Sequence, residues 1–296
     1  MSFIIPSFQG LAAFSSAPLL LDNISNLSFS AVWSLIRELT SYTGYLCDIR
    51  IDKVGQPEYR VKYDANNVFS LNSPCYDSSD AYQGALGDLV GSDSAYCKKY
   101  YDQIGAQHVI QATDSAQPKI INAGSLITQN SSPVLSFDGG DWLQRQDAVI
   151  INQTSGTWTF LCGVIDDSGD TTTDQILDHD QNPRVAQFLR KASSNYNTIT
   201  IVPSVVTCTE AKQASFNICS GSNDGTNMGL YVNNDGDDIK SAAGSATGAA
   251  HFTMGATWAG LNLFTGKLGA VIFANNTNTT DREAIRDALM TRYGVS

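Results

Sequence analysis

The stretch KKYYDQIGAQHVIQATDSAQPKIINAGSLITQNSSPVLSFDGGDWL, residues 98–143, decides how the chain is organised. It sets turn-forming residues between short apolar runs, at Tyr101-Asp102-Gln103, Gln117-Pro118, Asn122-Ala123-Gly124 and Asp138-Gly139-Gly140-Asp141. Because Asn, Asp, Gly and Pro favour tight turns, this pattern is typical of short strands joined by turns. A helical pattern precedes the stretch, and a series of strand patterns follows it.

Composition supports a β-rich protein. Only four glutamates occur in 296 residues, whereas Asp, Asn, Ser, Thr and Gly are abundant, which favours strands and turns over long solvated helices. The apolar content of 42% is enough for a full core. The net charge of -11 argues against nucleic acid or an anionic membrane as a partner.

The N-terminal residues form a separate apolar segment. Residues 1–17 lack a basic leader, and Pro6 interrupts their apolar run, so they fit neither a secretory signal nor a membrane span. We interpret them as an arm that anchors the protein to neighbouring subunits through Phe3, Ile4, Ile5 and Phe8. Residues 18–296 are then expected to form one elaborated domain, with a lead-in at 18–143 and the main sandwich at 144–296.

The lead-in has two patterns of its own. Val32, Leu35, Ile36 and Leu39 recur at helical spacing, with Ser30 as a possible cap and Gly44 as a stop, so a helix is predicted over 28–44. Residues 45–61 alternate like a hairpin, and residues 79–90 favour a short helix.

The second half of the chain reads as about eight short strands. Asn233-Asn234-Asp235-Gly236 is a hairpin turn, because Asn and Gly tolerate the positive φ that such a turn requires. A closing helix is predicted over 280–293, with a capping box at Thr280 and Glu283 and a stop at Gly294. The expected fold is therefore mainly β, a sandwich or jelly roll with an N-terminal helix and hairpin and a C-terminal helix.

Cysteines and histidines do not form metal motifs. The six cysteines have no metal-ligand spacing and are interpreted as free thiols; Cys75 and Cys97 are the one pairing worth testing as a disulfide. The three histidines are dispersed, so no catalytic metal is expected. Clusters of Asp and Asn at 166–174, 223–227 and 233–238 could offer oxygen ligands to calcium, but turn chemistry is the favoured interpretation and no cofactor is predicted.

Several pieces carry a resemblance to a known family. In order, these are LIRELTSYTGYLCDIRI, KKYYDQ, QATDSAQPKIINAG, LSFDGGDWL and the C-terminal FTGKLGAVIFANNTNTTDREAIRDALMTRYGV. Together they cover roughly residues 18–295. This arrangement resembles the arabinofuranosidase B-type catalytic domain, and still more the phage virion proteins that share its concanavalin A-like, or laminin-G-like, sandwich. The resemblance departs after Tyr101-Asp102-Gln103, where Ile104-Gly105-Ala106-Gln107 replaces the usual Ser-Gly-Asn-Gly.

The candidate site residues fall into two groups. Tyr101, Asp102, Gln103 and Trp142 could bind a sugar by stacking and hydrogen bonding, although the altered loop favours a structural junction for the first three. The resemblance implies a catalytic glutamate near residues 177–182, where this chain has none. Asp178 and Asp180 share a strand face there and are the candidate catalytic carboxylates. Trp158 and Trp258 are expected to be core residues.

The function predicted first is a non-enzymatic structural protein of a phage virion. It would be made in the host cytoplasm, displayed on capsid or tail as a homo-oligomer among other virion proteins, and able to bind glycans through sandwich loops. The alternatives are an arabinofuranosidase-like glycoside hydrolase and a soluble lectin.

Overall fold

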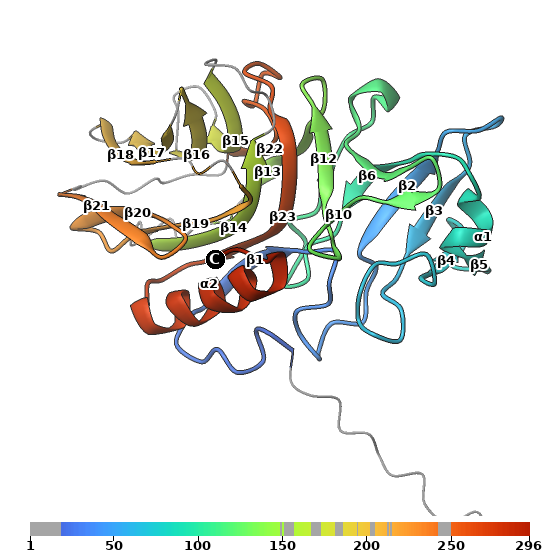
Figure 1. Cartoon of the computed structure of the whole chain (residues 1–296), viewed down its shortest axis with the longest axis horizontal. Coiled ribbons are helices and arrows are strands. Elements are labelled where there is room, and N and C mark those ends of the chain that lie inside the picture. Colours follow the sequence, from blue (N-terminus) through green and yellow to red (C-terminus); the bar gives the residue numbers. More distant parts are fainter. Residues whose placement is uncertain are drawn as a thin grey trace, which may run out of the picture.

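The computed structural model describes residues 19–148, 150, 157–166, 173–180, 186–193, 195–201, 205–211, 213, 215–241 and 250–296. The proposed arm at 1–17, with Phe3, Ile4, Ile5 and Phe8, lies outside these residues. The fold is mainly β, as predicted, with a two-sheet sandwich on one side and a β-rich extension on the other (Figure 1).

The first sheet of the sandwich centres on the long strand β23. Strands β1 and β12 pair along one edge of β23, and β14 pairs along the other and continues to β19, β20 and β21. All of these pairings are antiparallel. The strands are β1 (Phe29–Trp33), β12 (Leu135–Asp138), β14 (Trp158–Asp166), β19 (Asn217–Asn223), β20 (Asn227–Val232), β21 (Asp235–Ser241) and β23 (Thr265–Ala274).

The second sheet runs in the order β13, β22, β15, β16, β17, β18. Its strands are β13 (Leu143–Ala148), β22 (Ala250–Met254), β15 (Thr173–Asp180), β16 (Ala186–Ala192), β17 (Asn195–Ile201) and β18 (Val205–Ala211). Aromatic side chains fill the space between the sheets: Trp158 and Phe160 from β14 and Phe273 from β23 meet Phe188 from β16 and Phe252 from β22. This aromatic layer is the main core of the sandwich.

One long helix covers the outer face of the first sheet. Helix α2 (Thr279–Tyr293) lies below β1 and β14 in Figure 1 and packs Ile285, Leu289 and Tyr293 against that face. It begins at Asn278, whose side chain accepts a hydrogen bond from the Asp281 N–H, so the cap lies two residues before the predicted Thr280. It ends at Gly294 in the left-handed conformation, as predicted.

The extension is built from short antiparallel strands and joins the sandwich by sheet pairing. It contains β2 (Cys47–Ile51), β3 (Glu58–Val61), β4 (Pro74–Tyr76), β5 (Tyr82–Ala85), α1 (Leu86–Val90), β6 (Ala95–Tyr100), β7 (Val109–Ile110), the 3₁₀ turn η1 (Asp114–Ala116), β8 (Lys119–Asn122) and β9 (Ser125–Leu126). A small separate hairpin follows, β10 (Thr128–Gln129) and β11 (Ser132–Pro133). Pairing of β8 with β12 and of β7 with β13 connects the extension to both sandwich sheets.

The predicted helix over 28–44 is wrong. Residues Phe29–Trp33 form strand β1 and pair with β23, and Ser30 donates its hydroxyl to the Ile150 carbonyl rather than capping a helix. Val32 and Leu35 are buried, as the helical pattern predicted, but Val32 lies in strand β1 and Leu35 in the irregular segment that follows it. The aromatic and β-branched residues of FSAVW fit an open sheet edge, and tertiary pairing overrides the local helical spacing.

Other local predictions hold. The hairpin at 45–61 is β2 and β3, and Asn233 takes a positive φ of 54° at the turn between β20 and β21. All six cysteines are free and buried, so Cys75 and Cys97 form no disulfide. No helix in the described ranges is long and apolar enough to cross a membrane.

Candidate functional site

The first candidate group, around Tyr101-Asp102-Gln103, is a structural junction. Asp102 is 1% exposed, and its two carboxylate oxygens accept four backbone N–H groups, from Val32, Ile104, Gly105 and Gln107, at 2.8–3.1 Å. Those four bonds fill the acceptor capacity of a carboxylate. Asp102 is therefore a turn-forming residue, and its assignment as a sugar ligand is wrong.

Gln103 is also a structural residue of this junction. Its Oε1 accepts from the Glu38 N–H at 2.8 Å, and its Nε2 donates to the carbonyls of Ser34 and Ile36 at 3.1 and 2.8 Å. Both amide protons are used within the protein, so Gln103 holds the segment after β1 in place and has no donor for a sugar.

Tyr101 lies at the edge of this junction. Its hydroxyl donates to Asp48 at 2.9 Å, and its ring contacts Tyr45 and His108. Burial and the nearby Asp48 carboxylate raise the pKa of the Tyr101 hydroxyl, which therefore stays protonated. The side chain links β2 to the loop that follows β6.

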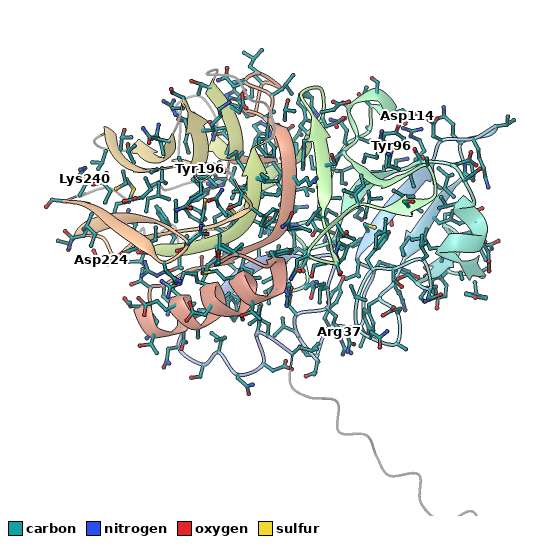
Figure 2. The ribbon with its side chains drawn as sticks, viewed as in Figure 1. Arg37, Tyr96, Asp114, Tyr196, Asp224 and Lys240 are labelled. Carbon is teal, nitrogen blue, oxygen red and sulfur yellow. The ribbon has the colours of Figure 1, made fainter. Side chains whose placement is uncertain are left out.

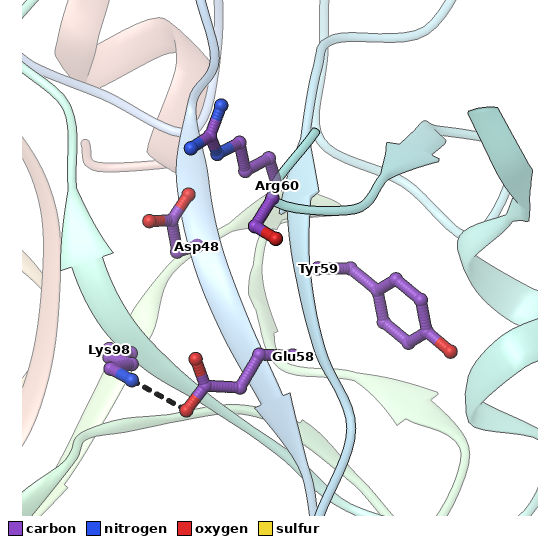
Figure 3. Close-up of a pocket in the computed structure, with 6 residues that line it drawn as sticks. Asp48, Glu58, Tyr59, Arg60 and Lys98 are labelled. Carbon is purple, nitrogen blue, oxygen red and sulfur yellow. Dashed lines mark hydrogen bonds and ion pairs between the residues drawn. The ribbon is translucent and has the colours of Figure 1, made fainter. Parts of the chain in front are cut away.

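A small hollow in the extension begins beside Tyr101 and is lined by Asp48, Glu58, Tyr59, Arg60 and Lys98 (Figure 3). Its charges are paired: Lys98 meets Glu58 at 2.5 Å, and Arg60 meets Asp80 at 2.7 Å. The hollow therefore presents ion pairs that already satisfy one another.

The second candidate group lies on the face of the second sheet that points away from the core. His179 stacks on Phe188 inside the sandwich, so its neighbour Asp178 points to the opposite face of β15. The register places Gln144, Thr253, Asp178 and Gln187 opposite one another across β13, β22, β15 and β16. Four strands thus contribute one row of polar side chains, called here the sheet-face row.

The loop after β22 closes over this row through Trp258. The Trp258 N–H donates to Asp178 Oδ2 at 3.1 Å, and the Trp258 carbonyl accepts from Gln144 Nε2 at 2.8 Å. Trp258 is 41% exposed, and its indole stacks on His251 with ring centroids 5.8 Å apart. The prediction that Trp258 is a core residue is wrong, whereas Trp158 is buried as predicted.

Trp142 belongs to the same surface. Its ring packs on Gly260 of the Trp258 loop so closely that a Cβ at Gly260 would come within 1.9 Å of it. Gly260 also has a φ of +70°, which favours glycine. Of the four predicted sugar-binding residues, Trp142 alone lies beside the sheet-face row.

Two polar atoms in this region are buried and have no hydrogen-bond partner among the described residues. They are Gln187 Oε1 and His251 Nδ1. Buried polar atoms are usually satisfied, so such atoms suit a ligand that completes their hydrogen bonds. The Asp180 backbone pairs with His251 across β15 and β22, and its side chain lies outside the described ones.

His179 follows Asp178 in the sequence but does not belong to the sheet-face row. Its Nε2 lies 3.1 Å from the Ala148 carbonyl, and burial lowers the pKa of His179 to about 4. The ring is neutral at pH 7 and forms part of the aromatic core.

A third cluster of charges lies between the extension and β12. Asp141, with Asp138 beside it, lines a hollow with Arg50, Tyr96 and Asp114; Figure 2 shows Tyr96 and Asp114 close together there. Burial and the Asp138 carboxylate raise the pKa of Asp141 to about 7. The described residues contain no group of three or more His, Cys, Asp and Glu side chains placed to hold a metal ion.

Comparison with known proteins gives a likeness of fold. No family model and no curated protein sequence matches the chain. A GH54 α-L-arabinofuranosidase soaked with a cyclic sulfate inhibitor matches with a TM-score of 0.62 and 11% identity over 88% of this chain. An arabinofuranosidase complexed with arabinofuranosyl-α-1,2-xylobiose matches with a TM-score of 0.62 over 91%. This chain spans 62% and 64% of the length of those two proteins.

These neighbours correct the functional prediction. The expectation of a protein that is not an enzyme is corrected, because the solved structures with a similar fold are glycoside hydrolases, including a Glu-to-Gln mutant soaked with 4-nitrophenyl α-L-arabinofuranoside. The neighbours named here support the arabinofuranosidase-like half of the resemblance and give no evidence of a phage origin. The virion location, the partner subunits and the arm stay predictions.

Sequence patterns found part of the sheet-face row and missed the rest. The sequence singled out Asp178, which lies in the row, while the shared face of Asp178 and Asp180 stays a prediction. Gln144, His251 and Gln187 come from three other strands, and only the register of the sheet brings them to Asp178. The Ala-Gly pair at 259–260 is the sequence signal for a loop at Trp258.

Proposed function

We propose that the protein is an arabinofuranosidase-like glycoside hydrolase whose sugar site is the sheet-face row under the Trp258 loop. The observation that carries the proposal is the buried carboxylate of Asp178, aligned with a row of amide and hydroxyl groups and bordered by an exposed indole. The fold shared with arabinofuranosidases supports the class of reaction but not the substrate.

The residues present suit the chemistry of glycoside cleavage. Such enzymes use two carboxyl groups, about 5–9.5 Å apart, that flank the bond to be broken. Asp178 and Asp180 lie two residues apart on one strand, so their Cα atoms are separated by about 7 Å. Other buried aspartates, such as Asp102 and Asp141, lie on different parts of the molecule.

We assign the two carboxylates different roles. Asp178 accepts the Trp258 N–H at 3.1 Å, which fixes the position of its carboxylate under the Trp258 loop. We assign Asp178 as the nucleophile or base, which attacks the anomeric carbon or activates water, and Asp180 as the acid that protonates the leaving oxygen. The Trp258 indole would stack on the apolar face of the sugar ring, and Gln187 Oε1 would accept one of its hydroxyl protons.

The test is hydrolysis of 4-nitrophenyl α-L-arabinofuranoside by the full chain. Asp178→Asn and Asp180→Asn should each lower kcat by about 10²–10⁴-fold, as expected when a catalytic carboxyl group is removed. Asp147→Asn is the matched control, because Asp147 is exposed on β13 and lies outside the row. Equal rates for the unmodified protein and for Asp178→Asn would refute the proposal.

A further inference from the structure

A second groove borders the sheet-face row on the other side of β13. It lies between β7 and β13, which pair at Gln144 and Ile110, and has a volume of about 480 Å³. That volume is within the range of small-ligand sites. The lining residues are His108, Ile110, Gln111, Ala112, Trp142, Gln144, Arg145 and Gln146.

The groove is built like a carbohydrate site. Trp142 offers an indole ring, Ile110 is 45% exposed, and the exposed Gln146 supplies a planar amide that can both donate and accept hydrogen bonds. Gln144 also donates to Thr253 and to the Trp258 carbonyl, so one side chain borders both the groove and the sheet-face row. A chain of linked sugars could therefore occupy both.

The charge of the groove differs from that of the whole protein. The chain carries a net charge of -11, yet the groove lining contains an arginine, Arg145, and no carboxylate. Among the described residues, Arg145 makes no ion pair, and its Nε is buried without a hydrogen-bond partner. A guanidinium in this state is suited to a planar carboxylate, which it can bind through two parallel hydrogen bonds.

His108 adds a neutral donor to the same lining. Its Nδ1 accepts from the Asp102 N–H at 3.0 Å, which leaves the ring proton on Nε2. Burial, and then Lys99, lowers the pKa of His108, so the ring is neutral at pH 7 and does not repel a cationic neighbour.

From this lining we infer that the groove binds a uronate, a sugar unit that carries a carboxylate, within an acidic polysaccharide. Arg145 holds the carboxylate, Trp142 stacks on a sugar ring, and the Gln146 amide binds a hydroxyl group. The inference deepens the proposed function and rests on it for the class of polymer. The binding itself does not depend on turnover at Asp178.

The experiment measures binding of two matched probes to the full chain by titration calorimetry in low salt. The probes are α-1,4-linked trigalacturonate and the same trimer with its carboxylates reduced to alcohols. The unmodified protein should bind the acidic trimer about tenfold more tightly, which corresponds to one charge-assisted hydrogen bond. Arg145→Gln should remove that preference, and Arg145→Lys should keep only part of it.

Two further variants test the inference independently of Arg145 and of catalysis. Gln146→Glu changes an exposed rim residue and adds a repelling charge, so it should remove the preference without altering a buried side chain. Asp178→Asn should leave the preference intact, which separates this inference from the proposed catalysis. Equal affinity for the two probes, or an unchanged preference in Arg145→Gln, would overturn the inference.

Discussion

The junction around Asp102 and the sheet-face row around Asp178 are both clusters of buried polar side chains, but they are constructed differently. At the junction, the Asp102 and Gln103 side chains use their hydrogen-bonding groups within the chain. At the sheet face, Gln187 Oε1 and His251 Nδ1 find no partner in the described part of the chain, and an exposed indole lies beside them. A saturated cluster holds the fold together, and a cluster with remaining capacity can bind a ligand.

The largest stability effect should come from the junction. Asp102→Ala would leave four backbone N–H groups without their acceptor, and the free energy of unfolding should fall by about 4 kcal/mol or more. Gln187→Leu at the sheet face removes an amide of similar burial, and the free energy of unfolding should change by less than about 1 kcal/mol. Urea unfolding of both variants compares the two regions directly, and equal losses would contradict the distinction.

A somewhat smaller loss is expected where the junction meets α2. Glu38 is fully buried, donates its N–H to Gln103, and binds Arg292 of the last helical turn through both carboxylate oxygens, at 2.6 and 3.0 Å. Glu38→Gln leaves that arginine without a countercharge and should lower the free energy of unfolding by about 3 kcal/mol.

The exposed pair in the hollow of the extension is the control for this change. Glu58→Gln breaks the contact with Lys98 at the surface, where such pairs contribute less than about 1 kcal/mol. Equal free energies of unfolding for Glu38→Gln and Glu58→Gln would contradict the prediction that the Glu38–Arg292 contact stabilises the fold.

A pH-dependent effect tests a carboxylate that belongs to neither cluster. Asp141 has a folded pKa of about 7, whereas its value in an unfolded chain is about 3.9. Between these values the folded state binds more protons than the unfolded state, so this group lowers the stability of the fold as pH rises from about 4 to 7. Asp141→Asn should therefore gain stability relative to the unmodified protein at pH 8 but not at pH 4.

The measurement is the difference in the free energy of unfolding between Asp141→Asn and the unmodified protein, determined at pH 4 and at pH 8. Other titrating groups, such as His179, are present in both proteins, so their contributions cancel in this difference. Asn keeps an oxygen that can accept the Asp138 N–H. A difference that is the same at pH 4 and pH 8 would show that Asp141 is not the group responsible.

Sequence reasoning reached the fold class because alternation and turn chemistry are local properties. The hairpin at 45–61, the turn at Asn233 and the closing helix were all readable from neighbours a few residues apart. The helix predicted over 28–44 failed because β1 is specified by β23, more than 230 residues away. The same limit hid Gln144 and His251, whose place beside Asp178 depends on strand register across the sheet.

The burial of all six cysteines has a practical consequence for labelling. Thiol-reactive dyes need an accessible thiolate, and burial raises the pKa of Cys47, Cys75, Cys162, Cys208 and Cys219. A single cysteine introduced at Val54, which is fully exposed on the turn between β2 and β3, would therefore be the most reactive thiol. A fluorophore attached there would report on the tumbling of the native protein without removal of any natural cysteine.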